Sequence, residues 1–83
     1  MITKDIQIES ETGLQSKTIA ELIQKASKYC SSIWVERDEK RANAKSMLGI
    51  LALEITSAAK ITIIADGEDE KAALKELGEF LSL

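Results

Sequence analysis

The sequence contains no histidine and a single cysteine, Cys30. Imidazole and thiolate groups are the usual ligands of zinc, so their scarcity leads us to expect no metal site. One cysteine cannot form an internal disulfide, which is typical of proteins of the reducing cytoplasm. We therefore interpret the chain as cytoplasmic and Cys30 as a small, buried, apolar residue.

The chain also lacks a basic excess and a long apolar run. Its formal net charge is −3 and its pI is about 4.9, whereas nucleic-acid-binding domains and polybasic membrane anchors carry surplus Lys and Arg. Every apolar run is far shorter than the roughly 20 residues that span a bilayer. The N-terminal stretch MITKDIQIE alternates and carries charge, unlike a signal peptide. We expect no direct contact with nucleic acid and none with a membrane.

Catalytic machinery is missing as well. The sequence shows no nucleophile–base pair, no metal-binding set and no glycine-rich phosphate loop, so we expect neither an enzyme nor a bound cofactor. The acidic residues Asp66, Asp69 and Glu70 are interpreted as solvated charges, since nothing pairs them into an acid–base dyad. The aromatic residues Trp34 and Phe80 are expected to pack rather than to serve as stacking platforms.

The residues that are present predict one small domain over positions 1–83, with the composition of a folded protein: 45% hydrophobic and 30% charged. Residues 2–8 alternate between apolar and polar, which is typical of a strand. Apolar residues spaced three and four apart predict a helix from about 16 to 29. The later patterns predict strands over 32–37, 41–44 and 60–66 and helices over 47–53 and about 69–81.

The expected order of elements is therefore β-α-β-β-α-β-α. The regular alternation of a parallel sheet is missing, and the second and third strands follow one another closely enough to form a hairpin. The economical solution is a two-layer α+β sandwich, in which a four-stranded antiparallel sheet carries its helices on one face. The opposite face is expected to carry Thr, Gln, Glu and Lys side chains, which suit solvent.

Four polar residues stand where a glycine turn runs into the first helix: Gln15, Ser16, Lys17 and Thr18. A helix N-terminus with polar side chains and one cation can hold an anion. The ordinary alternative is a solvated helix start, capped either by Ser16 or by a capping box from Thr18 to Glu21. Gln15 donates and accepts hydrogen bonds, but it cannot act as a nucleophile or a general base.

A second candidate site surrounds Ser46, which precedes the short helix predicted from Met47. Its ordinary function is to cap that helix by accepting a hydrogen bond from a backbone N–H. The functional alternative is phosphorylation, since a phosphate there would face the positive end of the helix. The neighbouring Lys45 adds a cation to the same region.

The short helix itself is rich in apolar residues. Met47, Leu48, Ile50 and Leu51 cannot all point inward on so few turns, so some of them must be exposed. Scattered exposed apolar residues need no explanation. A cluster of Met and Leu beside a switchable charge is nevertheless a candidate docking patch, because such side chains adapt to different partners.

Three stretches together resemble HPr, the phosphocarrier family of the bacterial sugar phosphotransferase system. They are GLQ at the start of the first helix, NAKSMLGILAL at residues 43–53 and GEDE at 67–70. The resemblance covers essentially the whole chain and implies the open-faced β-sandwich of that family. HPr proteins carry a phosphoryl-accepting histidine where this chain has Gln15, an arginine at the position of Lys17 and a proline at the position of Thr18. The resemblance therefore implies that phosphocarrier chemistry is absent.

The resemblance also gives Ser46 a function. Its position matches the regulatory serine that an HPr kinase/phosphorylase modifies, after which the phosphorylated form acts as corepressor for a LacI-type catabolite control regulator. Lys45, Met47, Leu48 and Leu51 match the docking region that partners use. The Crh branch of the family has glutamine in place of the histidine and keeps the serine, as this chain does. The implied function is a regulatory protein of carbon catabolite control.

Two other functions stay open at this point. The protein could be a binding module that docks without phosphorylation and competes for HPr partners. It could also retain phosphotransfer through Ser16 or Thr18, although neither has a visible general base. The sequence leaves monomer and dimer open as well, since exposed strand edges in so small a domain permit dimerisation or strand exchange.

Overall fold

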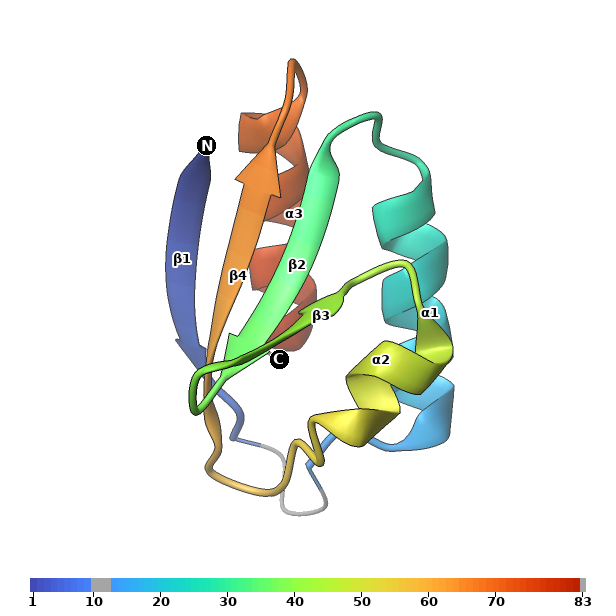
Figure 1. Cartoon of the computed structure of the whole chain (residues 1–83), viewed down its shortest axis with the longest axis vertical. Helices are drawn as coiled ribbons and strands as arrows, with labels where there is room; N and C mark the ends of the chain where they lie inside the picture. Colours follow the sequence, from blue (N-terminus) through green and yellow to red (C-terminus); the bar gives the residue numbers. More distant parts are fainter. Residues whose placement is uncertain (10–12, 83) are drawn as a thin grey trace.

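The computed structural model describes residues 1–9 and 13–82. Seven elements follow in the expected order β-α-β-β-α-β-α, which confirms the predicted fold class. Figure 1 shows an open sheet with helices packed on one side of it. The elements are β1 (Ile2–Gln7), α1 (Ser16–Ser27), β2 (Ser32–Arg37), β3 (Lys40–Asn43), α2 (Met47–Ala52), β4 (Lys60–Asp66) and α3 (Glu70–Leu81).

The sheet has the strand order β1-β4-β2-β3, and all its neighbouring strands are antiparallel. β4 therefore lies between β1 and β2, although it is the last strand in the chain. The crossings that this order requires are made by α1 and by α2 with its loops. β1 and β3 form the two edges of the sheet (Figure 1).

The core lies between the sheet and the helices. Alternate residues of the two central strands point to the helices and are buried, as the period of two requires. The helices contribute stripes at helical spacing, and the small residues among them let backbones approach. The core includes Ile6, Ile33, Val35, Ile61, Ile63, Ala65, Ile19, Leu22, Ala26, Ile50, Ala73, Leu77 and Leu81.

The outer face of the sheet is less polar than expected. Trp34 and Ile64 stand directly opposite each other on β2 and β4, and Ile64 is buried there. The guanidinium of Arg41 lies 5.8 Å from the centre of the Trp34 ring and donates to Glu36. Direct cross-strand neighbours are close enough to cover each other, so one large aromatic ring shields an apolar residue that alternation alone places toward solvent.

Two predictions about the first helix are wrong. The helix ends at Ser27, so Cys30 lies beyond it in an exposed turn and is not a buried core residue. The residue in the N-cap position is Gln15, and no side chain forms a capping hydrogen bond. Neither Ser16 nor Thr18 caps the helix, because the chain has already entered helical geometry at these positions.

Candidate functional site

The position of the α1 N-terminus is set by Gly13. This buried residue has a φ of 68°, a left-handed conformation that glycine adopts without steric cost. A Cβ added there would lie 2.6 Å from the carbonyl oxygen of Ile55 and 2.7 Å from the carbonyl carbon of Thr56. The next residue, Leu14, donates its backbone N–H to the oxygen of Ile55 at 3.1 Å. The start of α1 is therefore held directly against the loop between α2 and β4.

Gln15 has extended backbone angles, and its carbonyl accepts the first helical hydrogen bond from the N–H of Ile19 at 2.9 Å. The side chains of Gln15, Ser16 and Lys17 are exposed, and Thr18 is half-buried. The predicted polar helix start is thus present as one continuous surface. Its chemistry is limited to hydrogen bonds and one ammonium charge, since an amide such as that of Gln15 cannot accept a phosphoryl group as an imidazole does.

A tight turn places Ser46 at the start of α2. The backbone N–H of Ser46 donates to the carbonyl of Asn43 at 3.0 Å, and the Asn43 side-chain oxygen accepts from the N–H of Lys45 at 2.8 Å. The Ser46 hydroxyl accepts from the backbone N–H of Gly49 at 3.2 Å. The predicted capping function of Ser46 is confirmed, and its half-buried hydroxyl lies beside the free N–H groups of the first turn.

Lys45 is directed away from the Ser46 hydroxyl. Its ammonium donates to the carbonyl oxygens of Tyr29 at 2.8 Å and of Ser31 at 3.1 Å, in the connection between α1 and β2. Ser46 has an extended backbone, with φ −118° and ψ 116°, and successive side chains in extended chain point to opposite sides. The sequence alone gave no signal for these two contacts, because both acceptors are backbone atoms distant in the chain.

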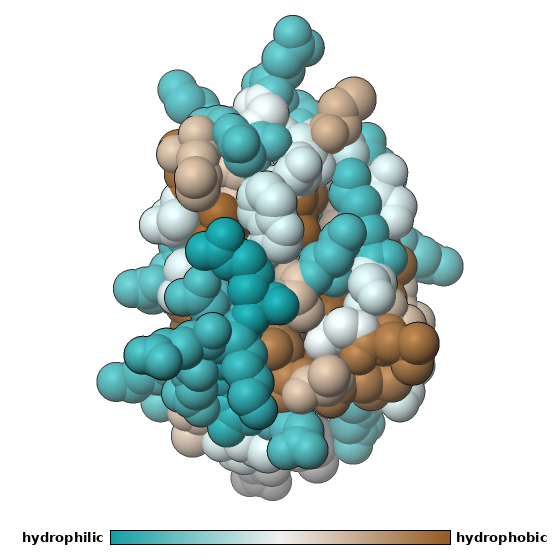
Figure 2. Space-filling model, in the orientation of Figure 1, coloured by the Kyte–Doolittle hydropathy of each residue, from teal (hydrophilic) through white to brown (hydrophobic). Residues whose placement is uncertain are grey.

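The apolar residues of α2 separate into two sets. Ile50 is fully buried, whereas Met47, Leu48 and Leu51 are 36%, 81% and 43% exposed, respectively. Figure 2 shows hydrophobic atoms gathered over α2, with strongly hydrophilic atoms beside them over the β2–β3 hairpin. We refer to Met47, Leu48 and Leu51 as the α2 patch. The prediction that part of this cluster is exposed is confirmed.

The other end of α2 is closed by a residue of the sheet. The guanidinium of Arg37, at the end of β2, donates to the carbonyl of Leu53 at 3.0 Å and to that of Glu54. Leu53 is the C-cap residue of α2 and Glu54 follows it, so the guanidinium lies at the carbonyl end of the helix. The Ser46 hydroxyl and the Arg37 guanidinium thus fix both ends of a helix of six residues.

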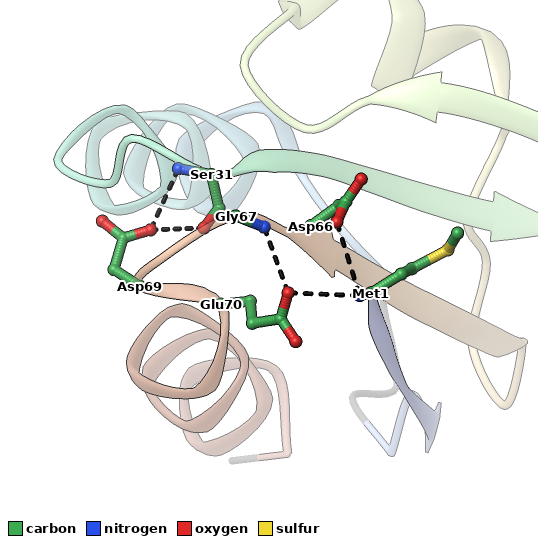
Figure 3. Close-up of polar contacts among 6 residues, drawn as sticks. All are labelled: Met1, Ser31, Asp66, Gly67, Asp69 and Glu70. Atoms are coloured by element: carbon green, nitrogen blue, oxygen red, sulfur yellow. Dashed lines mark hydrogen bonds and ion pairs between the residues drawn. The ribbon is translucent and has the colours of Figure 1, made fainter.

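The acidic residues at the start of α3, Asp69 and Glu70, are not simply solvated, which corrects that interpretation. The Asp69 carboxylate accepts from the N–H of Cys30 at 2.8 Å, from the N–H of Ser31 at 2.9 Å and from the buried Ser31 hydroxyl. Glu70 accepts from the N–H of Gly67 at 3.1 Å and pairs with the Met1 ammonium at 3.2 Å (Figure 3). Because the Ser31 hydroxyl and the Cys30 N–H favour the charged form, the pKa of Asp69 is lowered.

A second link joins α1 to α3. The Tyr29 hydroxyl donates to the carboxylate of Glu76, which also pairs with Lys28 at 3.0 Å and Lys25 at 3.5 Å. The hydrogen bond from Tyr29, followed by that from Lys28, lowers the pKa of Glu76 to about 2. The same hydrogen bond raises the pKa of Tyr29 to about 12. These contacts join the C-terminal end of α1 to α3.

Among residues 1–9 and 13–82, no three His, Cys, Asp or Glu side chains come together in a way that could hold a metal ion. No helix of this part of the chain is long and apolar enough to cross a membrane.

Comparison with known proteins identifies the family. A family profile described as "PTS HPr component phosphorylation site" matches residues 2–82. The chain belongs to the HPr family. HPr-like protein Crh of Bacillus subtilis is 35% identical over 81 residues, which cover 98% of this chain and 95% of that protein. HPr-like protein Crh of Halalkalibacterium halodurans is 38% identical, with 98% and 96% covered. The predicted resemblance to HPr and Crh is confirmed.

Solved structures support the same membership. HPr-C-His from Thermoanaerobacter tengcongensis superposes with a TM-score of 0.93 at 40% identity, covering 98% of this chain and 91% of that one. Crh of Bacillus subtilis, described as a dimer with a swapping domain, superposes with a TM-score of 0.78 at 34% identity, covering 98% and 93%. The relatives are named phosphocarrier or HPr-like proteins, which is consistent with the expectation that this HPr-family chain is not an enzyme.

Proposed function

We propose that this HPr-family protein is a regulatory protein of carbon catabolite control, switched by phosphorylation of Ser46 and unable to act as a phosphocarrier. Phosphorylated or not, it would act by docking other proteins through the α2 patch. By resemblance to the family, the proposed partners are an HPr kinase/phosphorylase and a LacI-type catabolite control regulator. The proposal needs no cofactor, no metal and no catalytic residue in this chain.

One observation carries this proposal: Ser46 caps the helix that presents Met47, Leu48 and Leu51 to solvent. A phosphate on the Ser46 hydroxyl would add close to two negative charges at the edge of the α2 patch. The free N–H groups of the first turn would remain favourable partners for it, so α2 would keep its structure. The charge of the docking surface would change while its apolar shape would not.

The proposed loss of phosphocarrier chemistry rests on Gln15. We assign Gln15, Ser16, Lys17 and Thr18 to a degenerate phosphocarrier site, in which the helix N-terminus is kept and the nucleophile is missing. Lys17 offers one point charge and lacks the planar fork with which an arginine binds two phosphate oxygens. The hydroxyls of Ser16 and Thr18 have no imidazole beside them in a chain without histidine, so phosphotransfer through either is the weakest alternative.

A kinase assay tests the proposal. Incubation with an HPr kinase/phosphorylase and ATP is expected to add one phosphate, located at Ser46 by mass spectrometry of the digested protein. The Ser46→Ala variant should take up none, and Ser16→Ala should take up as much as the unaltered chain. If a kinase that modifies a true HPr in the same tube leaves this protein unmodified, the switch does not exist. Enzyme I with phosphoenolpyruvate is expected to yield no phosphoprotein.

A phosphorylation-independent binding module is the alternative function, and the exposure of the α2 patch without any phosphate on Ser46 favours it. In this case the patch would dock constitutively and compete with a histidine-bearing HPr. Ser46→Ala and a protein carrying phosphoserine at residue 46 should then recover the same partners with the same affinities. If the two proteins recover different partners, or bind them with different affinities, the phosphorylation switch is supported and the constitutive module is excluded.

A second copy of the chain is a further proposed partner. Crh and an HPr from Thermoanaerobacter tengcongensis are both described as dimers in solved structures. In this chain β1 and β3 are the edge strands, and an unpaired edge is a template for pairing with another chain. Sedimentation velocity over a wide concentration range should show a dimer fraction that rises with concentration. A single monomeric species throughout would rule out this assembly.

A further inference from the structure

One peptide group in the connection between α1 and β2 is held at both ends by opposite charges. The carbonyl oxygen of Tyr29 accepts from the Lys45 ammonium at 2.8 Å, and the N–H of the same peptide unit, that of Cys30, donates to the Asp69 carboxylate at 2.8 Å. Ser31 is also held by both charges, but across two peptide units: its carbonyl oxygen lies 3.1 Å from the Lys45 ammonium, and its N–H donates to Asp69 at 2.9 Å. Hydrogen bonds to charged groups are about twice as strong as neutral ones.

Lys45 also belongs to the turn that carries Ser46. Its backbone N–H donates to the Asn43 side chain, and the buried Ala44 donates its N–H to the carbonyl of Ile33 at 2.8 Å. The turn is therefore fastened on one side to β2 by its backbone. On the other side, among the hydrogen bonds of residues 1–9 and 13–82, only the Lys45 side chain joins the turn to residues 29–31.

We propose that Lys45 is a positioning residue for Ser46, and that it is neither a phosphate-binding cation nor a docking charge. It holds the Ser46 turn against the α1–β2 connection, which Asp69 holds from the other side. The biological meaning of this inference rests on the proposed function of Ser46. The contacts of Lys45 themselves do not depend on whether any kinase modifies the protein. In this arrangement the Lys45 ammonium binds backbone carbonyls, and a phosphate on Ser46 would be bound by the backbone N–H groups of α2.

Backbone amide exchange tests the anchor. Lys45→Met keeps the aliphatic stem and removes the ammonium, so exchange of the Cys30 and Gly49 amides is expected to accelerate about tenfold. Lys45→Arg restores a donor and should restore protection. Lys75→Met, which removes one charge from an exposed position of α3, is the matched control and should change neither amide. Unchanged exchange at Cys30 and Gly49 in Lys45→Met would overturn the inference.

The unaltered protein provides a measurement that does not depend on a stable variant. In ¹⁵N-detected NMR the ammonium of Lys45 should exchange its protons more slowly than that of Lys75, since two carbonyls hold it. Equal exchange at the two lysines would contradict the anchor.

A measurement on the phosphate of phosphoserine 46 shows whether Lys45 anchors the turn or instead neutralises the phosphate charge. Phosphoserine is placed at residue 46 by genetic encoding, so the result does not depend on whether any kinase accepts the protein. The second pKa of its phosphate, followed by ³¹P NMR, should be the same in the Lys45 and Lys45→Met backgrounds. A pKa that rises when the ammonium is removed would show that Lys45 neutralises the phosphate, and the anchor assignment would be wrong. Failure of the kinase assay, by contrast, bears only on the proposed switch.

Discussion

Replacing Gly13 by alanine tests the geometry that sets the first candidate site against the α2–β4 loop. The φ of 68° costs an L-residue about 1–2 kcal/mol. The new Cβ would stand 2.6 Å from the Ile55 oxygen, and the crowded neighbours are backbone atoms that cannot rotate away. Overpacking of this kind costs roughly 1–3 kcal/mol. Reduced entropy of the unfolded chain returns about 0.4–1 kcal/mol, so the net loss should be about 1–5 kcal/mol.

Gly78→Ala is the matched control, because the chemical change is identical and the environment is not. Gly78 lies inside α3, and its added Cβ would meet the Lys4 side chain, with Cδ and Nζ at 3.1 Å. This flexible side chain is exposed and can move aside. Alanine is better than glycine by about 1 kcal/mol in a helix interior, so the variant should be unchanged or more stable by up to about that amount.

Urea unfolding of both variants, followed by circular dichroism, measures the difference. A folded chain of 83 residues has a total unfolding free energy of about 4–12 kcal/mol, so the Gly13→Ala loss is a large part of it. If Gly13→Ala loses less than about 1 kcal/mol, or no more than Gly78→Ala, the described contact between Gly13 and the α2–β4 loop is not the constraint that we infer.

Three further predictions concern other parts of the molecule. Asp38 and Glu39 form the β2–β3 turn at φ 49° and 68°, so Glu39→Gly should raise the unfolding free energy by about 0.5–1 kcal/mol in urea. Because the pKa of Glu76 is lowered, the unfolding free energy should fall as the pH drops from 4.5 toward about 2. Because the pKa of Tyr29 is raised, the unfolding free energy should also fall as the pH rises from 10 toward about 12. Glu76→Gln should reduce both dependences, since it removes the carboxylate from the shared hydrogen bond. Leu48→Ser should change stability by less than about 0.5 kcal/mol and weaken partner binding in calorimetry; unchanged affinity would exclude Leu48 from the docking surface.

The order of elements was predictable from the sequence because each element carries its own local signal. The alternation in β1 and the three- and four-residue spacing in α1 and α3 reflect which side of the element is buried, and this is the main determinant of their structure. The Ser46 cap was predictable for the same reason, since its hydrogen-bond donor, Gly49, is only three residues away.

The mispredicted features depend on contacts between distant parts of the chain. Asp69 looked solvated because its partners, Cys30 and Ser31, precede it by almost forty residues. The outer face of the sheet was expected to be polar, but it buries Ile64, whose cover, Trp34, belongs to another strand. Before α1, Gly13 packs against the α2–β4 loop and the helix begins with Gln15 at the N-cap, so the side-chain caps that local patterns favour do not form.

The closure of both ends of α2 has a consequence for binding. Isolated helices shorter than about 12 residues are marginal in water, yet this one has six. Arg37 and Ser46 keep it folded before any partner arrives. A partner that contacts Leu48 therefore meets a preorganised helix and does not bear the conformational entropy of ordering it. Differences in affinity between partners should then arise from how their own surfaces fit the side chains of Met47, Leu48 and Leu51 and the proposed phosphate on Ser46.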